Sequence, residues 1–344
     1  MKDVLVNFRI EDTAKCRLYG EGLINDTYIV VTTKGKYILQ KLNTNVFLDP
    51  EAIASNLELL YQYDTNKLLV PVIRSVNGVI FHIDEKGDYW RLSLFIEEAI
   101  TFQKIEERYQ VDAAARAFAS FLNLTALIPE KKIKTVIPDF HNGLSRWNQF
   151  ERALESASIK RKEIASDAIK RIKNNKYIFE EANELIQNSP LLITHNDTKI
   201  NNVLIDPLNK VYKNVIDLDT VMQGYLMYDF GDMVRTMANS SNENEQDLTK
   251  VYFRIEVFEQ LCKGFSDVYS KKLTNDEKSS LIYSGSYMAL IMGLRFLTDY
   301  LNNDIYYHTS YEQENLNRSI NQLKFIDSIF SSNSAIKKLV EFYF

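Results

Sequence analysis

Cysteine and histidine are scarce in this chain, and their scarcity excludes several classes of protein. Only two cysteines, Cys16 and Cys262, occur in 344 residues, and they lie far apart, so a disulfide framework is excluded and a reducing cytosol fits best. None of the four histidines is spaced with another histidine or a cysteine in the way zinc ligands are. Because neither the N-terminus nor the most apolar run, 288–294, suits a signal peptide or a membrane span, we expect a soluble, cytoplasmic protein with no membrane partner.

The chain also lacks an excess of positive charge. It has 41 lysines and arginines against 46 acidic residues, a formal net charge of −5, so the basic surface of a nucleic-acid-binding protein is missing. Its 45% hydrophobic and 25% charged residues are ordinary for a globular protein. The length of 344 residues suits two domains or one two-lobed unit. We therefore expect no nucleic-acid partner, and nothing indicates an obligate protein partner.

The first hundred residues are predicted to form a small sheet crossed by one helix. Residues 27–32 and 36–42 are rich in β-branched and aromatic side chains and are predicted to pair as antiparallel strands. Asp49-Pro50 is predicted to open a helix, with the aspartate as its N-cap and the proline at its first position. Two further strands are predicted at 79–83 and 89–96.

After residue 96 the hydrophobic spacing becomes helical. Apolar residues in 111–122 and 248–261 follow the i, i+3/i+4, i+7 rule, and Thr274 with Glu277 forms a capping box that opens a long apolar helix towards Leu301. Strand signals return only between residues 202 and 217. The sequence thus predicts an α+β fold, with a β-rich lobe at 1–96 and a larger, mostly helical lobe at 97–344.

A short segment in the second lobe carries the most informative pattern. Two apolar, β-branched pieces, 203–205 and 215–216, are predicted to pair as a hairpin, which places Asn202 and Asp217 at the same end. Amide and carboxylate oxygens are suitable ligands for a Mg²⁺ ion that bridges nucleotide phosphates. Asp197, on the loop before the hairpin, could face the same point and take the proton from an attacking hydroxyl.

These residues fit the H-x-D-x-x-x-x-N pattern of phosphoryl-transfer enzymes with a protein-kinase-like fold. Asp197 is the predicted base, and Asn202 and Asp217 are the predicted metal ligands. Lys199 could reach the γ-phosphate and offset charge in the transition state. His195 is predicted to have a structural role, because it can hold the loop through backbone hydrogen bonds.

A second candidate for the metal-binding motif lies further along the chain. Asp229-Phe230-Gly231 spells the metal-binding triplet of protein kinases. It lies well past the predicted hairpin, whereas Asp217 directly follows a strand. We therefore interpret Asp229 and Asp232 as residues that support the site or cap a helix. The G-x-x-x-x-G-K-[ST] motif does not occur in the chain, which excludes a P-loop enzyme.

The first lobe offers candidates for contacts with a nucleotide. Lys41 ends an apolar strand, the usual context of the lysine that pairs with the α- and β-phosphates, although a surface lysine at a strand end has the same pattern. Glu58, on the following helix, is its predicted ion-pair partner, with Glu51 as the alternative. Gly22 is predicted to lie in a phosphate-covering loop, and Glu97 in the hinge whose backbone contacts adenine.

On these motifs the chain resembles the aminoglycoside phosphotransferase/choline kinase-like family and, within it, the N-acetylhexosamine 1-kinases. The resembling stretches are 37–43, 194–202, 216–222, 228–232 and 295–301. Asn196 stands where the broad family usually has glycine after the histidine, as in the hexosamine-kinase variant. The resemblance implies phosphorylation of the anomeric hydroxyl of GlcNAc or GalNAc, dependent on ATP and Mg²⁺, giving the sugar 1-phosphate and ADP.

The acceptor site is predicted partly from residues and partly from this resemblance. Arg295 and Asp299 are four apart on one face of an apolar helix, where a charged pair is costly unless it is satisfied. Spacing alone favours an intrahelical salt bridge and a sugar-binding role about equally. The resemblance implies that Arg295, Tyr306 and Thr220 line the acceptor pocket, and that Asp219 either binds a hydroxyl or caps its loop.

Two alternative functions stay open at this point. One is a kinase of another small alcohol, such as choline, homoserine or an aminoglycoside; a cationic acceptor would require an acidic or aromatic cage. The other is a kinase-like protein that binds nucleotide without catalysis, although such proteins usually lack the base or a metal ligand. The sequence leaves open GlcNAc or GalNAc, ATP or GTP, and monomer or dimer.

Overall fold

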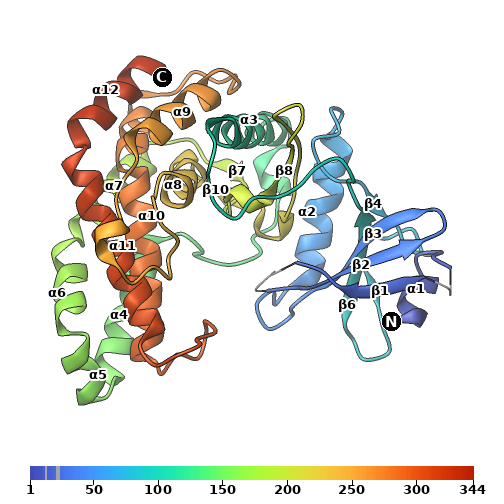
Figure 1. Cartoon of the computed structure of the whole chain (residues 1–344), viewed down its shortest axis with the longest axis horizontal. Coiled ribbons are helices and arrows are strands. Elements are labelled where there is room, and N and C mark those ends of the chain that lie inside the picture. Colours follow the sequence, from blue (N-terminus) through green and yellow to red (C-terminus); the bar gives the residue numbers. More distant parts are fainter. Residues whose placement is uncertain (12–13, 21–23) are drawn as a thin grey trace.

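The computed structural model describes residues 1–11, 14–20 and 24–344, which form a small sheet-containing lobe and a larger helical lobe (Figure 1). The helices and strands of the small lobe are α1 Lys2–Val6, β1 Lys15–Leu18, β2 Asp26–Thr32, β3 Gly35–Lys41, α2 Pro50–Tyr63, β4 Val72–Ile73, β5 His82–Ile83 and β6 Tyr89–Leu94. The strand order is β1-β2-β3-β6-β4, with β5 also paired to β6, and the pairs are antiparallel. The predicted protein-kinase-like two-lobed fold is confirmed.

The two helices of the small lobe join different hydrophobic cores. Leu5 of α1 packs with Leu39 and Leu92 on one face of the sheet. Helix α2 lies between the sheet and the helical lobe (Figure 1), and its buried Ile53 and Leu57 belong to the core of the larger lobe. Burial of this apolar surface therefore ties the sheet to the helical lobe.

Local signals predicted most of these boundaries. The Asp49 carboxylate accepts a hydrogen bond from Ala52 N at 2.9 Å, and Pro50 is the first helical residue of α2. The predicted strand 79–83 is shorter, and only His82–Ile83 pairs with β6. Its first residues are used in a turn, in which the Val79 carbonyl accepts a bond from Ser75 N at 2.9 Å.

The larger lobe consists mainly of helices. Its helices and strands are α3 Arg108–Thr125, α4 Gly143–Ser156, α5 Ile159–Ile164, α6 Ser166–Asn174, α7 Tyr177–Gln187, β7 Leu192–Thr194, β8 Val203–Asp206, β9 Val211–Val215, β10 Met222–Gly224, α8 Leu226–Met237, α9 Ile255–Ser266, α10 Asn275–Leu301, α11 Glu314–Ser331 and α12 Asn333–Tyr343, with short 3₁₀ helices at Glu130–Lys132, Ile200–Asn202, Leu218–Thr220 and Leu248–Lys250. Strands β8 and β9 pair with each other, and so do β7 and β10. The predicted lobe boundary at 96/97 falls between β6 and α3 and stays a prediction.

Helix α10 runs through the helical lobe and packs against α4, α7, α8 and α11 (Figure 1). It begins at the predicted capping box, where Thr274 Oγ1 accepts from Glu277 N at 3.1 Å and the Glu277 carboxylate accepts from Thr274 N at 2.8 Å. Gly231 allows α8 to approach closely, because a Cβ there would lie 2.4 Å from the Ser284 carbonyl oxygen. By length and composition α10 could cross a membrane, but 72% of its most apolar window is buried inside the protein.

One helix begins later than the hydrophobic spacing predicts. Leu248 lies in a 3₁₀ helix, and α9 begins only at Ile255. Between them the backbone pairs with the segment after α8, since the Tyr252 carbonyl accepts a bond from Ser240 N at 3.0 Å. This pairing keeps the chain extended and delays the helix.

Candidate active site

The loop between β7 and β8 places Asp197, Lys199 and Asn202 together. Lys199 Nζ lies 2.6 Å from Asp197 Oδ1, and Asn202 Nδ2 donates to Asp197 Oδ2 at 2.8 Å. Burial opposes ionisation of Asp197, but Lys199 and Asn202 outweigh it and hold the pKa of the carboxyl below its usual value. Asp197 is therefore ionised at neutral pH, as a proton acceptor must be.

The predicted hairpin forms, and it brings Asn202 and Asp217 to the same end. Val203 pairs with Val215 in the β8–β9 ladder, and Ile216 N donates to the Asn202 carbonyl at 3.0 Å. Asp217 follows immediately in a left-handed conformation, with φ 61°. Its side chain is open to solvent, as a residue that receives a ligand has to be.

The charges around this end fit a divalent cation. Desolvation by the surrounding protein, followed by repulsion from the carboxylates of Asp219 and Asp197, raises the pKa of Asp217 to about 7. A nearby positive charge would therefore stabilise the ionised form of Asp217. Both bonds that Asn202 donates to Asp197 use Nδ2, and neither involves the amide oxygen. Carboxylate and amide oxygens suit Mg²⁺. No group of three His, Cys, Asp or Glu side chains placed to hold a metal occurs in the described part of the chain, so phosphate and water oxygens would complete the coordination.

Asp229 holds the loop between β7 and β8, the predicted catalytic loop, in place. Its carboxylate accepts hydrogen bonds from the backbone N–H groups of His195 and Asn196 at 2.9 and 2.8 Å, and Thr198 Oγ1 donates to its carbonyl at 2.6 Å. Asn196 has φ 64°, a left-handed conformation that glycine and asparagine adopt most easily. The interpretation of Asp229 as a supporting residue agrees with these contacts.

Residues 15–255 match the APH phosphotransferase enzyme family, which is more than half of the chain. The chain belongs to this family. The resemblance inferred from the sequence motifs is therefore confirmed at the level of the family, and the protein is a small-molecule phosphotransferase of the APH/choline kinase type.

Solved structures share the fold over nearly the whole chain. A microcompartment-associated aminopropanol kinase is 17% identical with a TM-score of 0.67, covering 98% of this chain and 97% of that one. An aminoglycoside phosphotransferase from Alicyclobacillus acidocaldarius is 11% identical with a TM-score of 0.65, covering 99% and 96%. A spectinomycin phosphotransferase in complex with ADP and spectinomycin is 14% identical with a TM-score of 0.55, covering 99% and 96%.

In this phosphotransferase Lys41 does not point into the site, contrary to the sequence-based prediction. Its ammonium lies 2.6 Å from Asp88 Oδ2. Successive strand residues face opposite sides of a sheet, so Lys41 shares a face with Leu39, which packs in the α1 cluster. The side chain of Gln40 points to the other face of the sheet, where its amide oxygen accepts a hydrogen bond from Arg91 Nε at 2.9 Å.

The predicted ion pair between Lys41 and Glu58 is also wrong. Both carboxylate oxygens of Glu58 bind Arg74, at 2.6 and 2.7 Å. The alternative partner, Glu51, is an exposed residue in the first turn of α2. Because Lys41 faces away from α2, neither glutamate is its partner.

The two remaining nucleotide candidates are not tested by the contacts. Gly22 lies outside the described residues. The Glu97 carboxylate lies 3.1 Å from Lys36 Nζ, in the segment that joins the lobes just before Ile100 pairs with Ile205. The adenine contact of this hinge stays a prediction.

Sequence reasoning missed a buried ion pair that joins the two lobes. Arg91, in β6, binds both carboxylate oxygens of Asp219, one of them at 3.0 Å. Asp219 is fully buried and also accepts a bond from Asn25 Nδ2 at 2.7 Å. Its carboxylate is therefore engaged by the first lobe, and neither predicted role, binding an acceptor hydroxyl or capping its own loop, describes it. The available signal was an arginine as the single charged residue of the strand 89–94.

Helix α10 and the loop that follows it present a positive, aromatic surface. The Arg295 guanidinium lies 5.4, 5.8 and 5.6 Å from the ring centroids of Phe140, Tyr306 and Tyr307. Arg146 is close enough that its pKa is lowered, first by burial and then by the charge of Arg295. We call these five residues the Arg295 cluster. Neither arginine has a carboxylate partner among the residues that the structure describes.

The salt bridge considered between Arg295 and Asp299 does not form. The Asp299 carboxylate instead accepts from the backbone N–H groups of Tyr306 and Tyr307 at 2.8 and 2.9 Å. It thereby fixes the loop after α10. The hydroxyl of Thr220 donates to the His195 carbonyl at 2.8 Å, so Thr220 supports the catalytic loop, and its contact with an acceptor stays a prediction.

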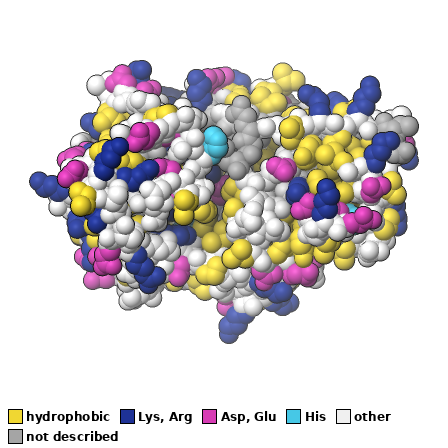
Figure 2. Space-filling view, turned by 90° about the horizontal axis from the view of Figure 1, so that it is seen from below, with side chains coloured by type: hydrophobic (Ala, Val, Ile, Leu, Met, Phe, Trp, Pro, Cys, Tyr) yellow, Lys and Arg dark blue, Asp and Glu magenta, His cyan; other side chains and the backbone are white. Residues whose placement is uncertain are grey.

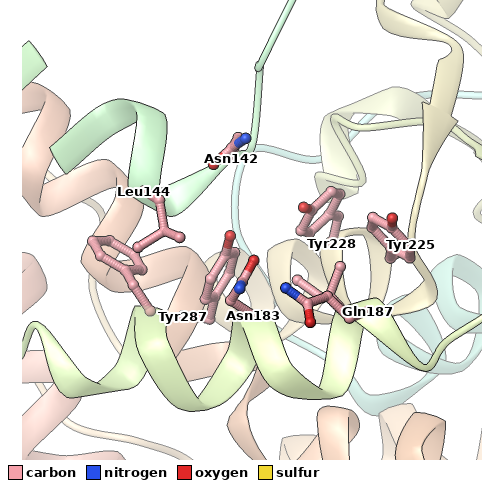
Figure 3. Close-up of a pocket in the computed structure, with 9 residues that line it drawn as sticks. Asn142, Leu144, Asn183, Gln187, Tyr225, Tyr228 and Tyr287 are labelled. Atoms are coloured by element: carbon pink, nitrogen blue, oxygen red, sulfur yellow. The ribbon is translucent and has the colours of Figure 1, made fainter. Parts of the chain in front are cut away.

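The surface is hollowed where the two lobes meet (Figure 2). A separate pocket of about 160 Å³ lies between α4, α7, α8 and α10, lined by Asn142, Leu144, Phe179, Asn183, Ile186, Gln187, Tyr225, Tyr228 and Tyr287 (Figure 3). It contains none of the predicted site residues. The ring of His141 packs on Tyr228, and its Nε2 lies 2.9 Å from the Asn196 carbonyl oxygen, which connects this pocket to the catalytic loop.

Proposed function

We propose that this phosphotransferase transfers the γ-phosphoryl group of ATP to the anomeric hydroxyl of an N-acetylhexosamine, GlcNAc or GalNAc, giving the sugar 1-phosphate and ADP. The observation that carries the choice of acceptor is the Arg295 cluster. The use of an adenine nucleotide is supported by the structural relative in complex with ADP. Location in the cytoplasm and the absence of an obligate protein partner stay predictions.

The Arg295 cluster lies beside the catalytic loop. Phe140, under the Arg295 guanidinium, directly precedes His141, whose Nε2 lies 2.9 Å from the carbonyl oxygen of Asn196. Asn196 in turn directly precedes Asp197. An acceptor bound against the cluster can therefore present a hydroxyl to the base.

The charge of the cluster disfavours an amine as acceptor. An ammonium group about 5 Å from a guanidinium is repelled by about 3 kcal/mol at an effective dielectric constant of about 20. Choline, ethanolamine, aminopropanol and aminoglycosides are cations, and no acidic side chain pairs with either arginine of the cluster within the described ranges. A neutral sugar carries no such cost.

The cluster also offers contacts that suit a sugar. Tyr306 is 58% exposed, so its ring can cover the apolar face of a pyranose. The Tyr307 hydroxyl is buried and has no hydrogen-bond partner in the described part of the molecule. Because an unsatisfied buried hydroxyl is costly, a ligand hydroxyl or acetamido group bonded to it would be favoured.

The catalytic loop supplies the chemistry. The Asp197 carboxylate accepts the proton of the attacking hydroxyl. Lys199, which is paired with Asp197 Oδ1, offsets charge on the transferred phosphoryl group. Asn202 and Asp217 would hold Mg²⁺, which when bound neutralises charge on the nucleotide phosphates. The site thus contains the base, a cation and the metal ligands that a catalytically inactive relative would lack.

A panel of acceptors tests this function. ADP release is measured with Mg-ATP and, one at a time, GlcNAc, GalNAc, glucose, choline, ethanolamine and homoserine, and the product is identified by mass spectrometry. We expect turnover with the N-acetylhexosamines and a product whose phosphate is on the anomeric carbon. Turnover with choline or ethanolamine but with neither GlcNAc nor GalNAc would refute the assignment. Omission of Mg²⁺ is expected to abolish the reaction.

A further inference from the structure

The register of the sheet places an arginine where the lysine was expected. Gln40 and Arg91 stand directly opposite each other in the β3–β6 ladder, and their side chains are joined by the bond from Arg91 Nε to Gln40 Oε1 at 2.9 Å. Lys41 and its partner Asp88 face the other side. Arg91 therefore lies on the face of the sheet opposite to Lys41, and it reaches the other lobe at Asp219.

The guanidinium of Arg91 ends close to the metal-binding end of the hairpin. It binds Asp219, which lies in the 3₁₀ helix Leu218–Thr220 directly after Asp217. Because Asp219 is only two residues from Asp217, Arg91 lies near the position where the phosphates would meet the metal.

The hydrogen bonds of Arg91 leave some of its donors for a ligand. A guanidinium has five N–H donors. Among the described residues it donates three hydrogen bonds, to Gln40 and to the two carboxylate oxygens of Asp219, so two of its N–H groups have no partner within that part of the chain. A planar, fixed guanidinium of this kind suits phosphate oxygens.

We propose that Arg91, and not Lys41, is the cation of the first lobe that contacts the nucleotide phosphates, and that Asp219 and Gln40 hold its guanidinium in position. This inference rests on the proposed use of ATP but not on the identity of the acceptor. The rival explanation is that the pair of Arg91 and Asp219 only links the lobes.

Nucleotide binding without acceptor separates the two explanations. Affinities for ADP and for adenosine are measured by calorimetry with Mg²⁺ in the wild type, in Arg91→Gln and in the matched control Lys41→Gln. We expect Arg91→Gln to bind ADP about tenfold or more weakly, the effect of losing a charge-assisted hydrogen bond, and to bind adenosine as the wild type does. Lys41→Gln is expected to bind both ligands unchanged.

Three results would overturn the proposal. One is an equal loss of ADP and adenosine affinity in Arg91→Gln, which a mere link between the lobes predicts. The second is wild-type ADP binding in that variant, and the third is a selective loss of ADP affinity in Lys41→Gln.

Thermal unfolding shows whether Arg91→Gln folds. If it does not fold, Arg91→Lys is used instead, because lysine keeps the positive charge but lacks the planar guanidinium. It should lose ADP affinity about threefold to tenfold with adenosine binding retained, and unchanged ADP affinity would overturn the proposal. Because no acceptor is present, failure here leaves the acceptor assignment standing. Failure of the acceptor panel likewise leaves this result standing.

Discussion

Replacing Asp197 with asparagine removes the proposed base while almost preserving its shape. The amide oxygen can still accept from Asn202, but the amide nitrogen cannot take a proton from an acceptor hydroxyl. General-base catalysis contributes about 10²- to 10⁴-fold in rate, or roughly 3 to 5 kcal/mol in the barrier. We expect kcat to fall by at least two orders of magnitude.

The same substitution should change stability only slightly. Lys199 loses its partner, but its side chain is 40% exposed, so the ammonium stays hydrated and the loss costs about 1 kcal/mol or less. The assay is ADP release with saturating GlcNAc or GalNAc, together with ADP affinity by calorimetry and the free energy of unfolding in urea. Asp167→Asn, at an exposed position in the first turn of α6, is the matched control and should behave as the wild type.

Turnover, ADP binding and stability of Asp197→Asn together decide whether Asp197 is the base. A variant that keeps ADP binding and folding but loses turnover supports Asp197 as the base. Turnover within fivefold of the wild type would refute it. A large loss of stability together with ADP binding would show that Asp197 acts mainly as the structural partner of Lys199 and Asn202.

Three further predictions follow from the packing. Burial lowers the pKa of His141 to about 4 against about 6.5 when unfolded; the unfolded state therefore binds the proton more tightly, and about 3 kcal/mol of stability is lost as pH falls from about 6.5 to 4. Urea unfolding at several pH values should show this loss in the wild type and not in His141→Gln. If the free energy of unfolding depended on pH equally in both proteins, the prediction would be contradicted. Gly231→Ala should cost about 1–3 kcal/mol, because its Cβ would lie 2.4 Å from the Ser284 carbonyl oxygen; Gly293→Ala, where the nearest atom is 3.2 Å away, should cost less, and the reverse order would refute the packing argument. Arg295→Gln should raise KM for the amino sugar about tenfold with KM for ATP unchanged, measured by ADP release, and an effect on ATP alone would move Arg295 out of the acceptor site.

Sequence reasoning worked where the deciding contacts are between residues close in the chain. The cap at Asp49, the capping box at Thr274 and the β8–β9 hairpin each depend on residues within about fifteen positions. The approach of Asn202 and Asp217 at one end of this hairpin could be predicted for the same reason, since a single turn joins the two strands.

Sequence reasoning failed where the partner lies in an irregular segment, because hydrophobic spacing does not show where such a segment places its backbone. The spacing of Arg295 and Asp299 allowed a salt bridge, but the backbone of residues 306–307 satisfies Asp299 instead. The helical spacing at Leu248 was likewise overridden by pairing with residue 240. In both cases a local preference worth a few tenths of a kcal/mol competes with several tertiary hydrogen bonds.

The amino-acid sequence by itself determined the family, the two-lobed order of strands and helices, and the placement of Asp197, Asn202 and Asp217 around one hairpin, because periodicity, caps and short motifs are local. The roles of these three residues as base and metal ligands stay proposals. Only the tertiary structure decided which of Lys41 and Arg91 reaches the other lobe. Lys41 and Arg91 are both basic residues in strands of the same sheet, and the register and pleat turn one towards Asp88 and the other towards Asp219, 128 residues away. An arginine within a strand indicates that a partner is needed, but the identity of the partner depends on how the two lobes pack against each other.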